Sequence, residues 1–251
     1  MSIRIKRFYD KIPNYDKSKI DNDFDNIDDL LIRLEGSIDN KDIKIVHQPI
    51  EDAFKSRLTI ILYQNNLRAF YLLTGIVTEL NADNLPAALP LIRAFYELMI
   101  QLGYLCSQIL NHNDLNYLLS ELFHKVFLGN RNEGAGVLAL GKVETISIMT
   151  MLSHAEKVFN SIDPEGTKDK QILTNYYADL SNKCHPNFNS NMFFTSLDEK
   201  GELLGLDDIG ENMSSVKALV YHEYMSPLLS AIDHYKLYMD KINADPKVVT
   251  T

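Results

Sequence analysis

The sequence predicts an all-α protein, folded as an up-and-down bundle of six or seven helices. Three observations predict this class. Only 11 glycines and 8 prolines occur among the 251 residues, long segments contain neither residue, and apolar residues recur with a helical period over most of the chain. The length suits one large domain or two small ones, and it is sufficient to bury a sizeable core.

The composition is that of an ordinary soluble globular protein, with 45% hydrophobic and 24% charged residues. Two cysteines, Cys106 and Cys184, cannot form a disulfide framework, and neither belongs to a CxxC pair. We therefore expect free thiols in a cytoplasmic protein. The charged N-terminus does not resemble a signal peptide, and the apolar windows 58–80 and 91–110 contain charges, which favours buried helices over membrane spans.

The charge of the chain limits its partners. A net charge of −9 makes the protein a poor non-specific binder of DNA or of an anionic membrane. The basic run 4–7 is an exception, and we interpret it as a solvated chain end. We expect no membrane partner.

The first half of the chain predicts four helices after an arm at 1–20. The segment 21–29 is rich in aspartate, and the apolar pattern that follows it is typical of a short amphipathic helix. Pro49 fits the first turn of a long helix that runs to about Asn81. The apolar face of that helix contains Phe54, Leu58, Ile61, Leu62, Ala69, Leu72, Leu73 and Ile76.

The next helix should be the central one. Pro86 and Pro90 open it, it runs to about Leu110, and it is apolar on nearly every side. Asn113 or Asp114 then caps a helix that continues to about residue 128.

The second half predicts three more helices and one β-hairpin. The helices span about 137–160, 168–184 and 213–243, and Pro227 should kink the last of them. The hairpin is expected around 192–206 with Gly201 in its turn. A single domain at 21–243 and a C-terminal tail at 244–251 complete the expected organisation.

Two polar stripes provide the main candidate site. A stripe with i, i+4 spacing on the central helix contains Arg93, Glu97 and Gln101, and Tyr104 joins it. A second stripe, on the helix 168–184, contains Tyr177, Ser181 and His185. Pro186 should end that helix at or just before His185, where the helix dipole favours an imidazolium.

These stripes allow two interpretations. In a binding or catalytic pocket, Arg93 would bind an anion, Glu97 would orient it, and His185 would act as acid, base or hydrogen-bond donor. Alternatively, the same groups form a buried polar network that fixes the register of two helices.

Other chemistries fit the sequence less well, so we expect neither a cofactor nor a metal. Glu121 and His124 form one ExxH motif, whereas a dinuclear site needs two. His154 and Glu156 match half of a zinc-deaminase motif without its PCxxC half. The pair 222–223 is solitary. The GxxxxGK match at 136–143 lacks its hydroxyl residue and a preceding strand, and there is no GxSxG nucleophile motif.

The segments 90–105 and 176–187 resemble a broad group of bacterial all-helical proteins that is similar to the HEPN superfamily, often found in defence and toxin–antitoxin systems. The group carries Arg-x-x-x-Glu on an early helix and Tyr-x-x-x-Ser-x-x-x-His-Pro on a later one. The matching residues are Arg93, Glu97, Tyr177, Ser181 and His185. Catalytic HEPN ribonucleases also carry an arginine shortly before the histidine, and the matching window 178–180 has none.

The resemblance implies a HEPN-like binding or regulatory module that forms homo-oligomers, with RNA or a nucleotide as its candidate ligand and a link to bacterial defence. We favour a non-catalytic module over an enzyme. The first alternative is a metal-independent ribonuclease that uses His185 and Arg93. The second is a purely structural oligomeric interaction protein.

Overall fold

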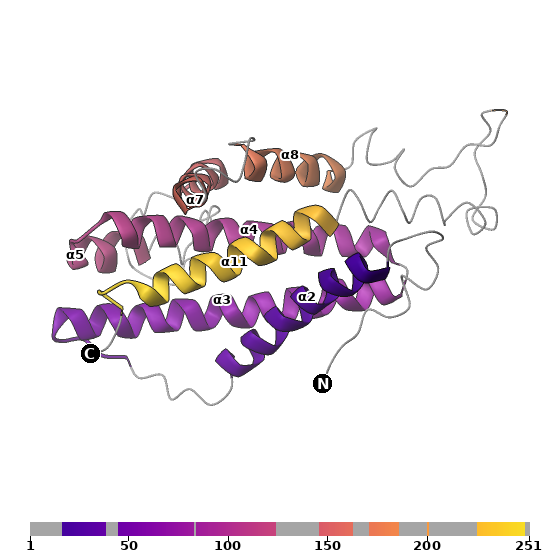
Figure 1. Ribbon diagram of the computed structural model, residues 1–251. Helices are drawn as coiled ribbons and strands as arrows, with labels where there is room; N and C mark the ends of the chain where they lie inside the picture. Colours follow the sequence, from indigo (N-terminus) through magenta and orange to yellow (C-terminus); the bar gives the residue numbers. More distant parts are fainter. Residues whose placement is uncertain are drawn as a thin grey trace, which may run out of the picture. The chain divides into compact units, whose positions relative to one another are not determined.

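The computed structural model describes residues 17–38, 45–82, 84–123, 146–162, 171–185, 200 and 225–248. Within them the protein is all-α, as predicted, with seven α-helices, one π-helical turn and no strand (Figure 1). The predicted β-hairpin at 192–206 lies outside these residues, apart from Lys200. The elements are α2 (Lys17–Ile38), α3 (Ile50–Asn81), α4 (Leu85–Asn111), α5 (Leu115–Tyr117), η1 (Leu118–Leu122), α7 (Ile148–Ile162), α8 (Ile172–Cys184) and α11 (Ser226–Ala244).

Several helix ends follow the residues that predicted them. Pro49 immediately precedes α3, and its carbonyl oxygen accepts a hydrogen bond from the amide of Ala53 at 3.0 Å. Asp114 caps α5, because its carboxylate accepts hydrogen bonds from the amides of Asn116 and Tyr117 at 2.9 and 3.3 Å. α8 ends at Cys184, one residue before His185, as Pro186 predicted.

Two helices differ from the sequence expectation. α2 begins at Lys17, inside the segment 1–20 that was expected to be an arm, and is longer than the short helix expected. Ile20, Phe24 and Ile27 continue the helical spacing upstream, which accounts for the longer helix. The helix expected at 137–160 begins only at Ile148, because residues 146 and 147 are not helical. Pro227 is the second residue of α11, and Met225 just before that helix is π-helical. The kink predicted at Pro227 stays a prediction, because the preceding segment 213–224 lies outside the described residues.

The chain divides into two compact units. Unit 1 contains Met1–Arg33, Ala69–Tyr96 and Asn175–Ile232, and unit 2 contains Leu34–Arg68, Glu97–Thr174 and Asp233–Thr251. Five helices, namely α2, α3, α4, α8 and α11, contribute residues to both units.

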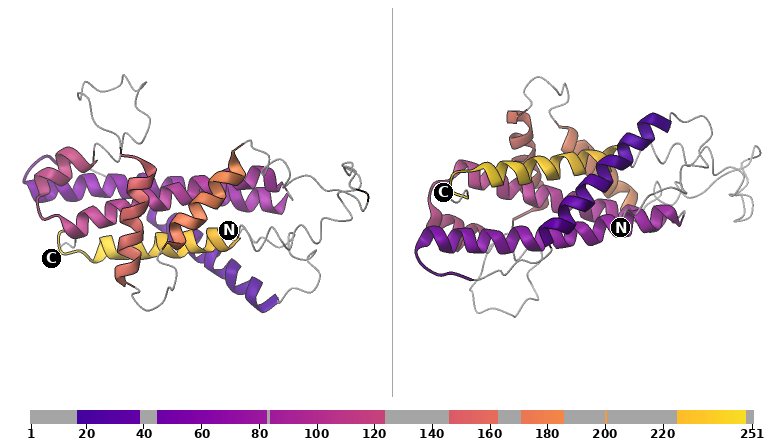
Figure 2. Two further views of the ribbon diagram at one scale, coloured as in Figure 1. Left: turned by 90° about the horizontal axis from the view of Figure 1, so that it is seen from above. Right: turned by 60° about the horizontal axis from the view of Figure 1, so that its bottom comes forward.

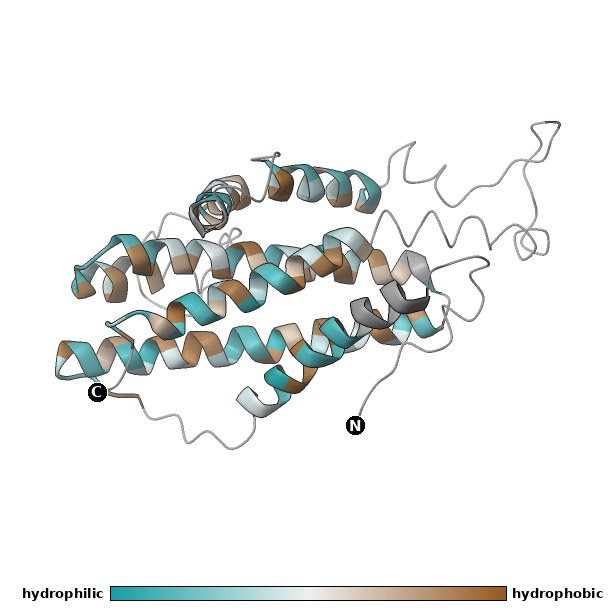
Figure 3. Cartoon of the chain, viewed as in Figure 1, coloured by the Kyte–Doolittle hydropathy of each residue, from teal (hydrophilic) through white to brown (hydrophobic). Residues whose placement is uncertain are grey.

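The core of unit 1 is built from apolar faces with helical spacing. On α3 the buried residues recur with helical spacing. Figure 3 shows apolar and polar positions alternating along this helix. Gly75 allows α4 to approach, because a Cβ atom at this position would lie 3.2 Å from Cδ1 of Leu91. The buried residues include Ile27, Leu30, Leu73, Ile76, Leu80, Leu89, Ile92, Phe95, Tyr96, Leu180 and Leu228.

Unit 2 is organised around the second half of α4. Every residue from Leu98 to Ile109 except Gln101 is buried, which confirms the expectation of a central helix for this segment. α7 lies across α4 and α11 (Figure 2). Gly103 makes this crossing possible, because an added Cβ atom would lie 2.6 Å from Cβ of Ala155 and 2.7 Å from Cε2 of Tyr238.

Hydrogen bonds join three helices inside unit 2. The hydroxyl of Tyr235 on α11 donates to Oδ1 of Asn66 on α3 at 2.8 Å. Nδ2 of Asn66 donates in turn to the hydroxyl of Ser37 on α2 at 3.0 Å, and that hydroxyl donates to the carbonyl of Leu34 at 2.7 Å. The side chains of Tyr235, Asn66 and Ser37 therefore each have a hydrogen-bond partner, as buried polar groups require.

Candidate functional site

The two predicted stripes contact each other in unit 1 at Arg93 and Tyr177. Cζ of Arg93, on α4, lies 5.9 Å from the ring centroid of Tyr177, on α8. Tyr177 is buried and Arg93 is half-buried. A guanidinium at this distance from an aromatic ring makes a cation–π interaction, which orients the charged group.

The stripe on α8 runs from the core to the surface. Tyr177 is buried, Ser181 is half-buried and His185 is exposed. The amide of His185 donates to the carbonyl of Ser181 at 3.1 Å and completes the end of the helix. Beside this stripe, Nζ of Lys183 forms an ion pair with Asp179 at 2.8 Å. A lysine in the last turn complements the helix dipole.

The rest of the stripe on α4 belongs to unit 2. Glu97 and Gln101 are half-buried, and Tyr104 is buried. The ring of Tyr104 packs edge-on against that of His154 on α7, with centroids 5.3 Å apart. Burial, with a smaller contribution from Tyr117, raises the pKa of the Tyr104 hydroxyl to about 12, so the group remains protonated near neutral pH.

The environment of His154 was not expected from the sequence. Its Nδ1 atom lies 3.3 Å from Oγ of Ser107 and 3.4 Å from Nε2 of Gln108, both on α4. Burial lowers the pKa of this imidazole, and the positive charges of Lys157 and His112 add to the effect. The sequence signal was the polar series Ser107, Gln108 and Asn111 on an otherwise apolar helix, since such residues need a partner.

Glu156 caps the helix α8. Its carboxylate, on α7, accepts hydrogen bonds from the amide and the hydroxyl of Thr174, in the first turn of α8, at 3.3 and 3.0 Å. A carboxylate at a helix N-terminus complements the helix dipole. No group of three or more metal-ligating side chains occurs within the part of the chain that the structure describes. The side chains of the predicted motifs at 121–124, 136–143 and 222–223 lie outside that part.

The two thiols are free, as expected. Burial raises the pKa of the Cys106 thiol to about 12, although Lys241 lowers it to a smaller extent and Asp245 adds to the increase. A thiol in this environment is protonated and therefore a weak nucleophile. Cys184 is half-buried on α8, on the side of the buried Leu173, Tyr177 and Leu180, which agrees with a packing role.

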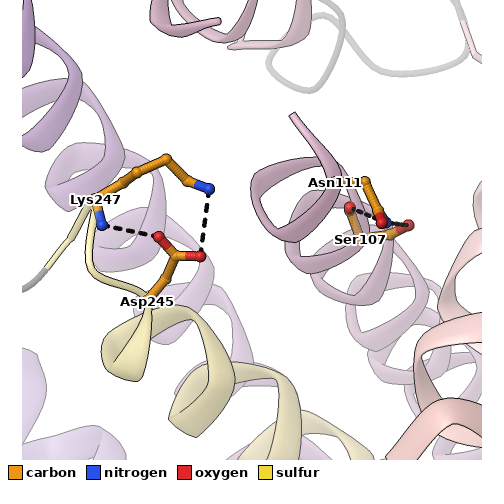
Figure 4. A network of polar contacts seen from close by, with 4 residues as sticks. All are labelled: Ser107, Asn111, Asp245 and Lys247. Carbon is orange, nitrogen blue, oxygen red and sulfur yellow. Dashed lines mark hydrogen bonds and ion pairs between the residues drawn. The ribbon is translucent and has the colours of Figure 1, made fainter. Parts of the chain in front are cut away.

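Asp245 and Lys247 form a polar cluster at the C-terminal end of α11 (Figure 4). The carboxylate of Asp245 is buried and accepts the amide of Lys247 at 2.8 Å, while Nζ of Lys247 lies 3.4 Å from the same carboxylate. In the same view Nδ2 of Asn111 donates to the carbonyl of Ser107 at 2.7 Å. The Asp245–Lys247 cluster and the Asn111–Ser107 contact each provide hydrogen bonds to polar atoms near a helix end.

The fold and these side chains define an all-α protein in which each of the two units contains polar clusters. Comparison with known proteins adds no narrower class, because no family model, curated protein or solved structure matches the chain. None of the helices in the described residues combines the length and the apolar character that crossing a membrane requires.

Proposed function

We propose that the protein is a HEPN-like binding or regulatory module, linked to bacterial defence or toxin–antitoxin systems, that binds RNA or a nucleotide without cleaving it. The contact between Arg93 and Tyr177 carries this proposal. A guanidinium held against an aromatic ring loses little conformational freedom when it binds, and its planar N–H groups match the oxygens of a phosphate.

The spacing along α8 favours binding over catalysis. Tyr177 and His185 are eight residues apart, which corresponds to about 12 Å along a helix axis. A general acid or base must lie within about 3 Å of the proton that it transfers. Arg93, next to Tyr177, and His185, at the exposed end of α8, therefore suit two successive groups of an extended ligand better than one reacting phosphate.

Fluorescence anisotropy with a short labelled single-stranded RNA at low salt tests the proposal. We expect Arg93→Ala to weaken binding about tenfold, which equals about 1.4 kcal/mol. Arg33→Ala is the matched control, because Arg33 is an exposed arginine of the same unit, paired with Asp29 at 3.2 Å. Equal losses in both variants would indicate non-specific electrostatic attraction and contradict the proposal.

The same samples separate the alternatives. Cleavage of the RNA by the wild-type protein, abolished in His185→Ala, would establish the ribonuclease that we consider the first alternative. Absence of RNA binding, combined with a large loss of stability in Arg93→Ala, would favour the purely structural protein. Light scattering after size-exclusion chromatography would determine whether the expected homo-oligomer forms.

A further inference from the structure

The ring of His154 on α7 contacts α4 in unit 2. Gln108 presents Nε2, which can only donate, at 3.4 Å from Nδ1 of the imidazole. With the Gln108 amide in this orientation Nδ1 is the acceptor, which assigns the proton of the neutral ring to Nε2. The hydroxyl of Ser107, at 3.3 Å, can donate to the same atom.

A second proton on the ring would remove this acceptor. In an imidazolium both nitrogens donate, so Nδ1–H would face the amide donor of Gln108. The hydroxyl of Ser107 can turn and accept from Nδ1–H, whereas the amide N–H of Gln108 cannot. Gln108 is buried, and a buried donor without an acceptor is costly. His154 is half-buried and close enough to solvent to take up a proton.

The charged neighbours do not offset a positive ring. Lys157 on α7 and His112 after α4 both act on His154, and both disfavour its protonated form. Other titratable groups on these elements include the hydroxyls of Tyr104 and Tyr117, the carboxylate of Glu156 and the buried imidazole of His234 on α11. The His234 ring packs against Phe159 of α7, with centroids 4.3 Å apart. The Glu156 carboxylate is already hydrogen-bonded to Thr174. On α11, Lys241 and Asp245 act on Cys106, and Asp245 is paired with Lys247.

We propose that His154 is an acid-sensitive latch between α7 and α4: protonation of its ring breaks the contact with the Gln108 amide and loosens α7 from α4. The edge-on contact with Tyr104 holds the ring in place in the neutral state. The latch is independent of Arg93 and Tyr177, so it does not rest on the proposed binding function.

Hydrogen exchange of the full chain tests the latch. We expect protection of the amides in 148–162, corrected for intrinsic exchange rates, to fall at least about tenfold between about pH 7.5 and about pH 5, the range in which histidine titrates. His154→Gln should lose most of this response, because glutamine keeps a hydrogen-bonding side chain that does not titrate. His185→Gln, which changes an exposed histidine in unit 1, should keep it.

The same pH response in wild type and His154→Gln would overturn the proposal, because another group, such as the buried His234 beside Phe159 of α7, would then cause it. No pH response in the wild type would also overturn it, because Gln108 would then turn its amide oxygen toward the charged ring and keep the contact. A second measurement does not require a folded variant. Nitrogen chemical shifts of the wild-type imidazole should report a proton on Nε2 and none on Nδ1 near neutral pH. A proton on Nδ1 would also overturn the proposal.

Discussion

Gly103 shows how one residue sets the distance between helices in unit 2. A methyl group at this position would meet Ala155 at 2.6 Å and Tyr238 at 2.7 Å, closer than carbon atoms approach one another. We expect Gly103→Ala to destabilise the protein by about 1–3 kcal/mol, the usual cost of overpacking a core. Urea denaturation measures the change as a lower midpoint at constant slope.

Gly36→Ala provides the matched control for that substitution. Gly36 lies in α2, and a Cβ atom there would meet no atom within 4 Å. Alanine is the better helix former by about 0.5–1 kcal/mol, so this variant should be slightly more stable than the wild type. A loss of stability of the same size in both variants would show that close packing is not the cause.

Tyr235 supplies a second residue-scale prediction. Its hydroxyl is the donor to Oδ1 of Asn66, so Tyr235→Phe leaves a buried acceptor without its hydrogen bond. We expect a loss of about 1–3 kcal/mol in the free energy of unfolding, the cost of a buried polar group without its partner. Tyr71→Phe is the control, because Tyr71 is 67% exposed and should lose almost nothing.

At the scale of elements, α8 depends on a cap supplied by another helix. Glu156 on α7 accepts both the amide and the hydroxyl of Thr174. We expect Glu156→Ala to cost about 1 kcal/mol, as for other helix caps, and to speed exchange of the Thr174 amide. Thr174→Val removes only the hydroxyl bond, so it should leave the amide bond in place and cost less. A larger loss in Thr174→Val would contradict the assignment of a cap.

The elements also show which features the sequence predicts well. Helix ends at Pro49, Asp114 and Pro186 depend on local chemistry, because a proline or a capping side chain acts on residues only a few positions away. The beginning of α2 was predicted too late in the chain. Apolar residues recur as regularly before Leu30 as after it, but the polar residues between them obscured this spacing.

At the scale of the whole molecule, the candidate site was predicted only in part. Helical periodicity shows which residues share a face, and it correctly placed Arg93 and Tyr177 on faces that make contact. It does not show which faces pair, because pairing depends on crossing angles and on side chains far apart in sequence. Tyr104 therefore packs against His154, a residue that the stripes did not include.

The division into two units leads to a final prediction about cooperativity. α3 and α4 each contribute one segment to unit 1 and another to unit 2, so neither unit can lose its helices without disturbing helices of the other. Helix formation is cooperative along a continuous segment. We expect a single unfolding transition, with a calorimetric enthalpy equal to the van't Hoff enthalpy.

Gly103→Ala extends this test, because its site lies in unit 2. If the units unfold together, the variant should reduce amide protection of α3 residues 73–80, in unit 1, by the same free energy as that of α7 residues 151–158, in unit 2. Reduced protection in α7 alone, or two calorimetric transitions, would show that the units unfold separately although they share helices.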